Sequence, residues 1–394
     1  MYAAAMTVPT GRPPIVGIVG AGQLARMTYQ AAIPLGVEIR LLAERETDAA
    51  ALIGSHLTIG YPDSEEALVA FARECDVVTF DHELVNAEAL CRLEARGHLV
   101  RPSARTVALA QDKQHQRDLF TRHGFPMPAF QTVSGLADLL AFADHHGWPV
   151  VAKSRRGGYD GRGVWLLNDA AEARSIVPSL IAAGTDLLAE TWVAIDRELA
   201  VVVARRPSGA TIAYPVVETI QHDGICREVI APAEIAPDVA AAAQALAHAV
   251  AEAVDAVGVM ALELFLAGER LSINEIAARP HNSGHLTIEG CETSQFAQHL
   301  RAILDWPLGA VDLTSNATVM VNILGNTAGD NPVNLLPAAL ADPGVHVHLY
   351  GKASRPGRKL GHVTVRGASV TEARTRAREA ALRLGTPTFV ESRP

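Results

Sequence analysis

The sequence VVAKSRRGGYDGRG at residues 150–163 combines a short apolar run with a lysine, three arginines and four glycines. Glycine in regular secondary structure costs about 0.5–1 kcal/mol relative to alanine, so an ordinary strand would not carry so many. We therefore predict a strand that leads into a glycine-rich flap with many free backbone N–H groups. Such groups suit a polyphosphate, and positive charge would come from Lys153, Arg155, Arg156 and Arg162. A solvated basic hairpin is the alternative interpretation.

The composition of the 394-residue chain is that of a globular protein, with 49% hydrophobic and 20% charged residues. This length predicts two or three domains. The net charge of −9 argues against nucleic acid or an anionic membrane as the main partner. No run approaches the ~18 apolar residues of a membrane span. The four cysteines are widely spaced, which indicates reduced thiols in a cytosolic protein.

The N-terminal region predicts a strand, a glycine-rich turn and a helix. Residues 15–19 form an apolar run, and GAGQLA at residues 20–25 turns it into a helix. A second strand over residues 37–42 ends shortly before Glu44. This is the dinucleotide-binding fingerprint, which by itself would indicate an NAD-dependent oxidoreductase. Another nucleotide or a phosphate could occupy the same turn, or the glycines could serve only helix–strand packing.

We expect residues 1–13 to be a disordered tail, because they do not have the pattern of a signal peptide. After residue 13, the periodicity of apolar residues predicts a mixture of helices and strands. Met6 is an alternative start to Met1. A buried strand over residues 76–80 would complete a small doubly wound α/β unit spanning residues 14–110. Further helices are predicted over residues 113–123, 136–146, 171–183, 239–257 and 371–384. Further strands are predicted over residues 186–193, 198–204, 211–217, 258–266, 271–275, 318–324, 345–349 and 362–365.

Glu263 and Glu275 indicate a metal site. They lie in ALELFLAGERLSINE at residues 261–275, which predicts a hairpin. A turn centred on Glu269 would place the two glutamates opposite each other on one face of a sheet. At about 4 Å and an effective dielectric constant of about 20, they would repel by roughly 4 kcal/mol. Mg²⁺ prefers carboxylate oxygens, and Asn274 adds a neutral oxygen; solvated strand carboxylates are the alternative.

Two later segments are rich in hydrogen-bond donors, RPHNSGH at residues 279–285 and KASRPGRK at residues 352–359. The spacing of His281 and His285 could indicate zinc, but a proline and a glycine disfavour a helix there and no third ligand is evident. Both segments better suit an anionic ligand, with a solvated surface turn as the alternative for the second. Lys153 is not a Walker lysine because no GxxxxGK[ST] motif is present, but it could contact phosphates as a point charge.

Five motifs in order resemble the ATP-grasp superfamily and, within it, the 5-(carboxyamino)imidazole ribonucleotide synthase family. They are GAGQLARM (20–27), RRGGYDGRG (155–163), GVMALELF (258–265), NEIAARPHNSGH (274–285) and YGKASRPGRKLGH (350–362). The resemblance implies an α/β fold, α+β overall, with a Rossmann-like N-terminal domain, an ATP-grasp domain and a small C-terminal domain. The implied boundaries are 1–13 for the tail, 14–112, 113–313 with a lid at about 128–193, and 314–394.

The resemblance also implies roles for individual residues. ATP would contact Lys113, Lys153, Gly158, Tyr159, Asp160, Gly161, Arg162, Gly163, Glu190, Thr191, Trp192, Val193, Glu198, Gln221, Asn274 and Glu275. Mg²⁺, or Mn²⁺ in its place, would be bound by Glu263 and Glu275. The ribonucleotide would contact Gln23, Leu24, Glu83, Tyr159, Asp160, Arg279, His281, Asn282, Ser283, Lys352, Arg358 and Lys359. The catalytic groups would be Arg279, His281 and Lys352.

The chain departs from the family pattern near the Asp-Gly turn at residues 223–224. The family usually has a nucleotide-contacting histidine just before this turn, whereas this chain has Gln221 followed by His222. Either the glutamine substitutes as a hydrogen-bonding group, or the local register is shifted. Lys113 likewise occupies a position where a relative has arginine.

The implied reaction is an ATP- and bicarbonate-dependent carboxylation of 5-aminoimidazole ribonucleotide in de novo purine (IMP) biosynthesis, through carboxyphosphate. The expected partners are these small molecules, with no nucleic acid or membrane, in a cytoplasmic homodimer. The alternatives are another ATP-grasp ligase, such as a formate-using ribonucleotide transformylase or a biotin carboxylase relative, an NAD-dependent oxidoreductase, and an inactive scaffold. NAD binding would explain nothing after residue 110, whereas the segments at 279–285 and 352–359 favour the ribonucleotide carboxylase.

Overall fold

The N-terminal unit is a parallel sheet with helices on both faces. The computed structural model describes residues 11–158, 161–326 and 331–388. In this first unit the strands follow the order β3-β2-β1-β4, all parallel. Its elements are β1 (Ile15–Val19), α1 (Gln23–Ala32), η1 (Ile33–Leu35), β2 (Glu38–Ala43), β3 (Leu57–Ile59), α2 (Glu65–Ala72), β4 (Val77–Phe80), α3 (Ala87–Ala95) and α4 (Ala104–Ala110). The predicted doubly wound arrangement is confirmed.

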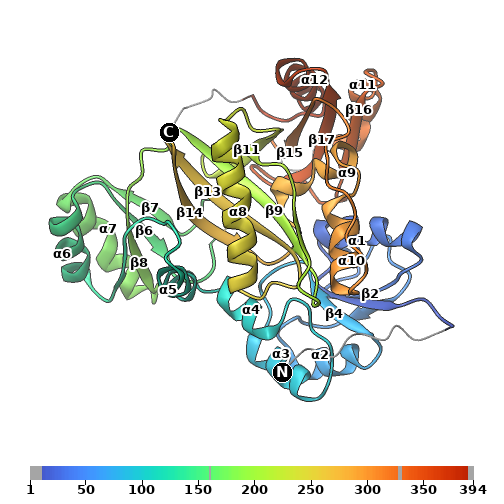
Figure 1. Cartoon of the computed structure of the whole chain (residues 1–394), viewed down its shortest axis with the longest axis horizontal. Coiled ribbons are helices and arrows are strands. Elements are labelled where there is room, and N and C mark those ends of the chain that lie inside the picture. Colours follow the sequence, from blue (N-terminus) through green and yellow to red (C-terminus); the bar gives the residue numbers. More distant parts are fainter. Residues whose placement is uncertain (1–10, 159–160, 327–330, 389–394) are drawn as a thin grey trace.

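A second unit, which we call the lid unit, stands at one end of the molecule (Figure 1). Its antiparallel sheet has the order β5-β8-β6-β7, and helices α6 and α7 pack on it. Helix α5 (Lys113–His123) leads into this unit. The elements of the lid unit are β5 (Phe130–Val133), α6 (Leu136–His146), β6 (Val150–Ser154), β7 (Val164–Leu167), α7 (Ala170–Ala182) and β8 (Leu187–Thr191). The flap predicted from the sequence connects β6 to β7.

The rest of the chain is built on one large antiparallel sheet, which we call the central sheet. Its order is β14-β13-β9-β11-β12-β15-β17-β16, with β10 paired to β9. Its strands are β9 (Arg197–Arg205), β10 (Thr211–Ala213), β11 (Val217–His222), β12 (Ile225–Ala231), β13 (Gly258–Ala267), β14 (Arg270–Ala277), β15 (Ala317–Leu324), β16 (Val345–Leu349) and β17 (Lys359–Gly367). Its helices are α8 (Pro237–Ala253), η2 (Asn282–Gly284), α9 (Thr287–Gly290), α10 (Gln295–Ile303), η3 (Pro332–Leu335), α11 (Leu336–Ala339) and α12 (Val370–Arg383).

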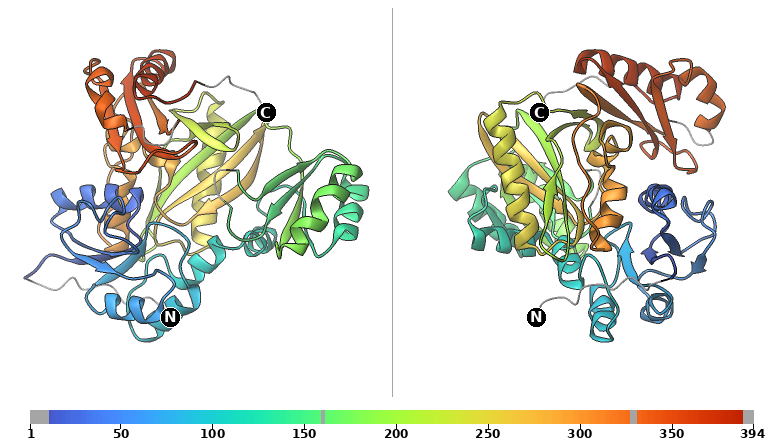
Figure 2. Two further views of the ribbon diagram at one scale, coloured as in Figure 1. Left: turned by 180° about the vertical axis from the view of Figure 1, so that it is seen from behind. Right: turned by 45° about the vertical axis from the view of Figure 1, so that its right-hand side comes forward.

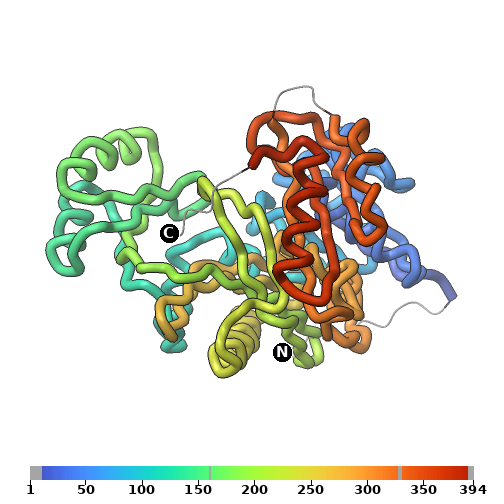
Figure 3. Tube along the Cα trace, turned by 90° about the horizontal axis from the view of Figure 1, so that it is seen from above, coloured from blue at the N-terminus to red at the C-terminus, as the bar shows by residue number. Residues whose placement is uncertain are grey.

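Strands β9, β13 and β14 of the central sheet lie between the lid unit and the two terminal parts of the chain. Helix α8 covers one face of this sheet and α10 lies on the other (Figure 2). The N-terminal unit and the strands β15–β17 lie together on the side away from the lid unit, which the view from above also shows (Figure 3). Within the described residues, no helix combines the length and the apolar character needed to cross a bilayer. All four cysteines are free thiols.

The predicted elements differ from the structure mainly at their ends. The predicted strand over residues 211–217 is two strands, β10 and β11, because Pro215 lies between them and proline cannot donate to a ladder. The predicted helix over residues 239–257 ends four residues early, at Ala253, and Asp255 adopts a φ of 52° in the connection to β13. The strand predicted over 186–193 ends at Thr191.

Candidate active site

Glu263 and Glu275 lie opposite each other across the β13–β14 hairpin, as predicted. The turn is centred between Gly268 and Glu269, because Ala267 pairs with Arg270. The predicted centre, at Glu269, was wrong by half a residue. That register alone would place Glu263 opposite Asn274. An irregularity in the pairing leaves Asn274 as an extra residue and restores the alignment of the two glutamates. Such a β-bulge re-aims side chains, and bulges are common next to active sites.

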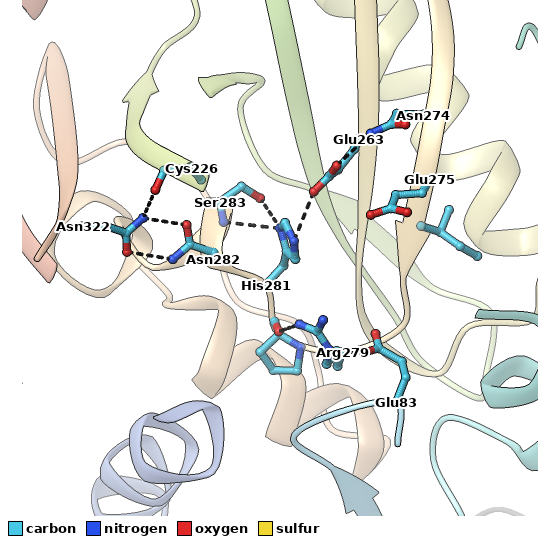
Figure 4. A network of polar contacts seen from close by, with 12 residues as sticks. Glu83, Cys226, Glu263, Asn274, Glu275, Arg279, His281, Asn282, Ser283 and Asn322 are labelled. Atoms are coloured by element: carbon cyan, nitrogen blue, oxygen red, sulfur yellow. Dashed lines mark hydrogen bonds and ion pairs between the residues drawn. The ribbon is translucent and has the colours of Figure 1, made fainter. Parts of the chain in front are cut away.

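The two glutamates are held by different neighbours, and Figure 4 shows those of Glu263, which are His281 and Asn274. Lys113 Nζ lies 2.9 Å from Glu275 Oε2, and His281 Nε2 lies 3.2 Å from Glu263 Oε1. Burial and the nearby charge of Glu275 raise the pKa of Glu263. Burial opposes ionisation of Glu275 as well, but the charge and hydrogen bond of Lys113 lower its pKa. The repulsion between the two glutamates is therefore reduced in two ways: protonation of Glu263 is favoured, and the charge of Glu275 is balanced by Lys113.

The donor set of this hairpin fits a hard divalent cation. Asn274 Nδ2 donates to Glu263 Oε2 at 3.1 Å, so an amide and two carboxylates share one face. Mg²⁺ usually takes one or two protein carboxylates and fills its other positions with phosphate oxygens and water. Across the described residues, no group of three or more His, Cys, Asp or Glu side chains is placed to hold a metal ion, so the protein ligands available here are the two carboxylates of the hairpin. His285 is fully buried and hydrogen-bonded to Gln295, which does not suit zinc.

Lys153 lies next to the last residue of β6, and its side chain reaches the β13–β14 hairpin. We refer to the region between the lid-unit sheet and this hairpin as the cleft. It is 6% exposed, and its Nζ lies 2.7 Å from Glu190 Oε2 and 3.1 Å from Asn274 Oδ1. Glu190 is also bound by Arg117, whose Nε donates to Oε1 at 2.7 Å. Burial opposes ionisation of Glu190, but Lys153 and Arg117 lower its pKa. Sequence reasoning missed Arg117; its i+4 spacing from Lys113 on one helix face is the signal that could have found it.

The base of the flap is fixed to the start of α5. Asp112 is fully buried, and its carboxylate accepts hydrogen bonds from Arg155 Nε at 2.8 Å and Arg156 Nε at 3.0 Å. Despite burial, these arginines lower the pKa of Asp112 to about 2. Asp112 also caps α5 through the backbone N–H of Gln114. Arg155 and Arg156 therefore neutralise a protein carboxylate. This differs from the prediction that their charges would be available to a phosphate. The sequence did not indicate that Asp112 is their partner.

The flap itself has the backbone that its glycines predicted. Gly158, Gly161 and Gly163 have φ values of 83°, 74° and 77°, in the left-handed region where a side chain is strained. A Cβ atom on Gly163 would also overlap with the Ser154 hydroxyl. Arg162 is exposed. Two other predicted residues, Tyr159 and Asp160, lie outside the described residues.

The segment expected to contact adenine and ribose leaves β8 and leads to β9. Thr191 and Val193 are half-buried, whereas Trp192 is 47% exposed. Burial raises the pKa of Glu198 to about 7, and the Gln221 side chain hydrogen-bonds to this carboxyl group. Gln221 therefore contacts a protein carboxyl group, and the pairing of β11 with β12 has a register shift between residues 220 and 221.

A cavity of about 680 Å³ lies at the N-terminus of α1, on the other side of the glutamate hairpin from the lid unit. Five of the predicted substrate-binding residues line it: Gln23, Leu24, Arg279, Lys352 and Arg358. Lys352 Nζ donates to Gln23 Oε1, and Arg279 Nε donates to Glu83 Oε2 at 2.7 Å. Burial, followed by the nearby charge of Arg358, lowers the pKa of Lys352 to about 8. Lys359 is half-buried at the start of β17.

Three more of the predicted substrate residues, His281, Asn282 and Ser283, lie on η2 and the residue before it. His281 Nδ1 is 2.9 Å from the Ser283 hydroxyl (Figure 4). Burial, then the charge of Arg279, lowers the pKa of His281 to about 3. Asn282 makes two reciprocal amide hydrogen bonds with Asn322, at 3.0 and 2.9 Å. Its side chain therefore holds the loop on β15, a function that the sequence did not suggest.

The glycine-rich turn before α1 is filled by a protein carboxylate. Asp81 is 6% exposed and accepts a hydrogen bond from the backbone N–H of Gly22. A Cβ atom on Gly20 would overlap with Asp81 Oδ1, so the glycines make room for this carboxylate. In a dinucleotide-binding protein the pyrophosphate would need that position at the helix N-terminus. The NAD-dependent alternative is therefore wrong for this turn, and sequence reasoning missed Asp81.

Comparison with known proteins agrees with this geometry. Residues 118–296 match the ATP-grasp domain, residues 14–111 the ribonucleotide synthetase preATP-grasp domain, and residues 318–376 the phosphoribosylaminoimidazole carboxylase C-terminal domain. The two-sheet cleft with its lysine and glutamates is thus that of an ATP-grasp enzyme.

Individual relatives show to which family of ATP-grasp enzymes the chain belongs. The chain is 45% identical over 375 residues to N5-carboxyaminoimidazole ribonucleotide synthase of Mycobacterium tuberculosis, covering 93% of this chain and 87% of the relative. It is 42% identical to the synthase of Synechococcus elongatus, covering 91% of each. The solved synthase of Aspergillus clavatus in complex with ADP and 5-aminoimidazole ribonucleotide superposes with a TM-score of 0.87 at 34% identity, covering 95% of this chain and 99% of that one. The chain belongs to the N5-carboxyaminoimidazole ribonucleotide synthase family.

Proposed function

We propose that the chain carboxylates 5-aminoimidazole ribonucleotide to N5-carboxyaminoimidazole ribonucleotide, consuming ATP and bicarbonate and releasing ADP and phosphate, in purine biosynthesis. One observation carries the proposal beyond family membership. The loop at residues 279–283 joins the nucleotide cleft to the cavity, since His281 contacts Glu263 while Arg279 lines the cavity. An intermediate made in the cleft therefore has a short path to an amine held in the cavity.

In the nucleotide cleft, Lys113, Lys153 and the flap amides would bind ATP phosphates, with the other predicted ATP-binding residues around them. Glu263 and Glu275 would hold Mg²⁺, which when bound neutralises phosphate charge. Attack of a bicarbonate oxygen on the γ-phosphorus forms carboxyphosphate and displaces ADP. Lys153 is already desolvated and held between Glu190 and Asn274, so it would exchange one of these contacts for a phosphate oxygen, and its charge would stabilise the transferring phosphoryl group.

In the cavity, the cations Lys352, Arg358 and Lys359 would bind the phosphate of the ribonucleotide. The exocyclic amine attacks carboxyphosphate, or CO₂ released from it, and loses a proton as phosphate departs. Arg279 and His281 lie where the two ligands would meet. The low pKa of His281 keeps its imidazole neutral, so that it can donate from one ring nitrogen and accept at the other.

Further proposals concern the context of the enzyme. We propose a homodimer in the cytoplasm, where reducing conditions suit its four free thiols. We also propose a division of labour among residues 14–112, residues 113–313 with the lid at about 128–193, and residues 314–394. The lid would exclude water from carboxyphosphate, which hydrolyses readily.

The test is ADP release by the purified chain in Mg²⁺, with bicarbonate and 5-aminoimidazole ribonucleotide omitted in turn. ADP release should require bicarbonate and be stimulated by the ribonucleotide, and carbon from ¹³C-bicarbonate should appear in the carbamate product. ADP release that is indifferent to bicarbonate would refute this reaction while leaving the ATP-grasp fold intact.

A further inference from the structure

Arg117 is a buried charged residue to which the proposed chemistry assigns no function. It lies on α5, four residues after Lys113, and none of its surface is exposed. Burying a guanidinium costs several kcal/mol unless its charge is paired and its donors are used. A helix that needed only to pack would place an apolar side chain at this position. The partners of Arg117 should therefore explain why it is there.

The partners come from both sheets that form the nucleotide cleft. On the lid side, Arg117 Nε and Nη2 lie 2.7 and 2.6 Å from Glu190 Oε1, on β8. On the other side, Nη2 donates to the backbone carbonyl of Asn274, on β14, at 2.6 Å. Lys153 repeats this pattern, since its Nζ contacts Glu190 Oε2 and Asn274 Oδ1. These four residues form a closed ring in which two cations each contact the same carboxylate and the same asparagine.

The carbonyl that Arg117 binds belongs to the residue that sets the register of the metal-binding hairpin. Asn274 is the extra residue of the bulge, and the two-residue turn would otherwise align it with Glu263. Only with the bulge do Glu263 and Glu275 face each other. A bulge residue is displaced from the regular ladder, so contacts from outside the sheet can decide whether it forms. Arg117 supplies such a contact to the backbone, and Lys153 supplies one to the side chain.

We propose that Arg117 is a positioning residue that clamps the Asn274 bulge, and through it the orientation of Glu263 and Glu275 toward a shared divalent cation. The clamp also fixes Glu190, which holds Lys153 in the cleft. This inference rests on the proposed role of the two glutamates as metal ligands. A lysine side chain is one atom shorter than an arginine side chain. At position 117 its ammonium could pair with Glu190 but would not extend to the place of Nη2, the atom that reaches the Asn274 carbonyl.

The experiment measures binding of Mn²⁺ to the full chain in saturating ADP, without bicarbonate or ribonucleotide, from the electron paramagnetic resonance signal of free Mn²⁺. The variants are Arg117→Lys and Arg117→Met, with Arg101→Lys as the matched control. Arg101 is also a buried arginine, 5% exposed, that donates to a backbone carbonyl, that of Ile303, but it lies outside the cleft. Melting curves of all variants are recorded in the same buffer.

Both Arg117 variants should bind Mn²⁺ at least tenfold more weakly than the parent, and Arg101→Lys should stay within twofold. Arg117→Met removes one partner of a buried ionic network and leaves Glu190 with only Lys153, so this variant is expected to melt at a lower temperature than the parent. If that variant does not fold, Arg117→Lys decides. Mn²⁺ affinity within twofold of the parent in a folded Arg117 variant would overturn the clamp. A parent chain that bound no Mn²⁺ would instead refute the metal assignment on which the clamp rests.

A second measurement separates positioning from a general loss of packing. In a closed ring, removing either Arg117 or Glu190 breaks the same clamp, so the effects of Arg117→Lys and Glu190→Gln should not add. The double variant should bind Mn²⁺ no more than about threefold more weakly than the weaker single variant. Additive losses would show that the two side chains act independently, and the ring would then have no role in positioning.

Discussion

The nucleotide cleft and the ribonucleotide cavity handle positive charge in opposite ways. In the cleft, Lys113, Lys153 and Arg117 each contact a glutamate within 3 Å. In the cavity, the contacts that Lys352 and Arg358 make are to neutral oxygens, of Gln23 and of the Ala353 carbonyl. The cleft is thus balanced before ligands arrive and must exchange partners to bind ATP. Carboxylates also line the cavity, and its Arg279 is paired with Glu83, but Lys352 and Arg358 can bind an anionic ligand without giving up a carboxylate partner. Binding in the cavity should therefore respond more steeply to the charge of Lys352 and to pH.

The largest expected effect is on the cleft. Replacing Glu275 by glutamine keeps the shape of the side chain but removes one of two facing carboxylates and the partner of Lys113. ATP turnover should fall by about 10³-fold, as expected when one main stabilising group is lost from a phosphoryl-transfer site. The measurement is ADP release in a coupled assay, with the melting temperature recorded in parallel. Glu269→Gln, at the exposed turn of the same hairpin, is the control and should be indistinguishable from the parent.

The next effect should be confined to the cavity. Lys352→Met removes a buried cation that would contact the ribonucleotide phosphate, and a charged hydrogen bond contributes about 1.5–3 kcal/mol. We expect the KM for the ribonucleotide to rise by about 30-fold, while the KM for ATP stays within twofold. Steady-state kinetics with each substrate varied in turn will measure this. An equal rise in both KM values would mean that the charge of Lys352 affects ATP binding as much as ribonucleotide binding, and the contrast between the two regions would be wrong.

The pH dependence should also distinguish the two regions. Lys352 has a pKa lowered to about 8, so it is charged at pH 7 and loses its proton as the pH rises through 8. The KM for the ribonucleotide should be flat below about pH 7.5 and rise above pH 8, by up to about tenfold per pH unit. Lys352→Arg keeps the charge and should flatten this rise up to pH 9.5. A wild-type profile unchanged up to pH 9.5 would contradict the assignment of Lys352.

The smallest effect tests how the cleft holds its flap. Asp112→Asn retains a good helix N-cap but loses the charge that binds Arg155 and Arg156, an effect of about 1 kcal/mol. We expect the KM for ATP to rise by about threefold, with little change in the KM for the ribonucleotide. Asp169→Asn, at the cap of α7, makes the same substitution away from the cleft and should change neither KM. A larger effect on the ribonucleotide than on ATP would show that the flap base serves the cavity.

The sequence predicted most of the fold and one half of the site. Apolar periodicity and the glycine and proline positions predicted many of the strands and helices but not, for example, β5, β12 or α10. The even spacing of Glu263 and Glu275 predicted their pairing. The pairing arises differently, however, because a bulge compensates for a turn one residue shorter than the prediction required. Arg117, Asp112 and Asp81 were missed because each is a buried charge whose partners lie far away in the sequence. Spacing along the chain could place Arg117 on the helix face of Lys113, but it carries no information about which distant residues these charges contact.

The continuity of the central sheet limits how the protein can be dissected. Strand β12 pairs with β15 along four residue pairs, so the C-terminal strands extend the sheet that carries the glutamates. A chain cut near residue 314 would leave the β12 edge uncovered, and unpaired edges promote aggregation. The cut would also remove Arg374 and Arg378 of α12, the two arginines that bind the fully buried carboxylate of Glu228. Chimeras between ATP-grasp enzymes should therefore exchange β12 and β15 together, since an expressible module cannot end between them.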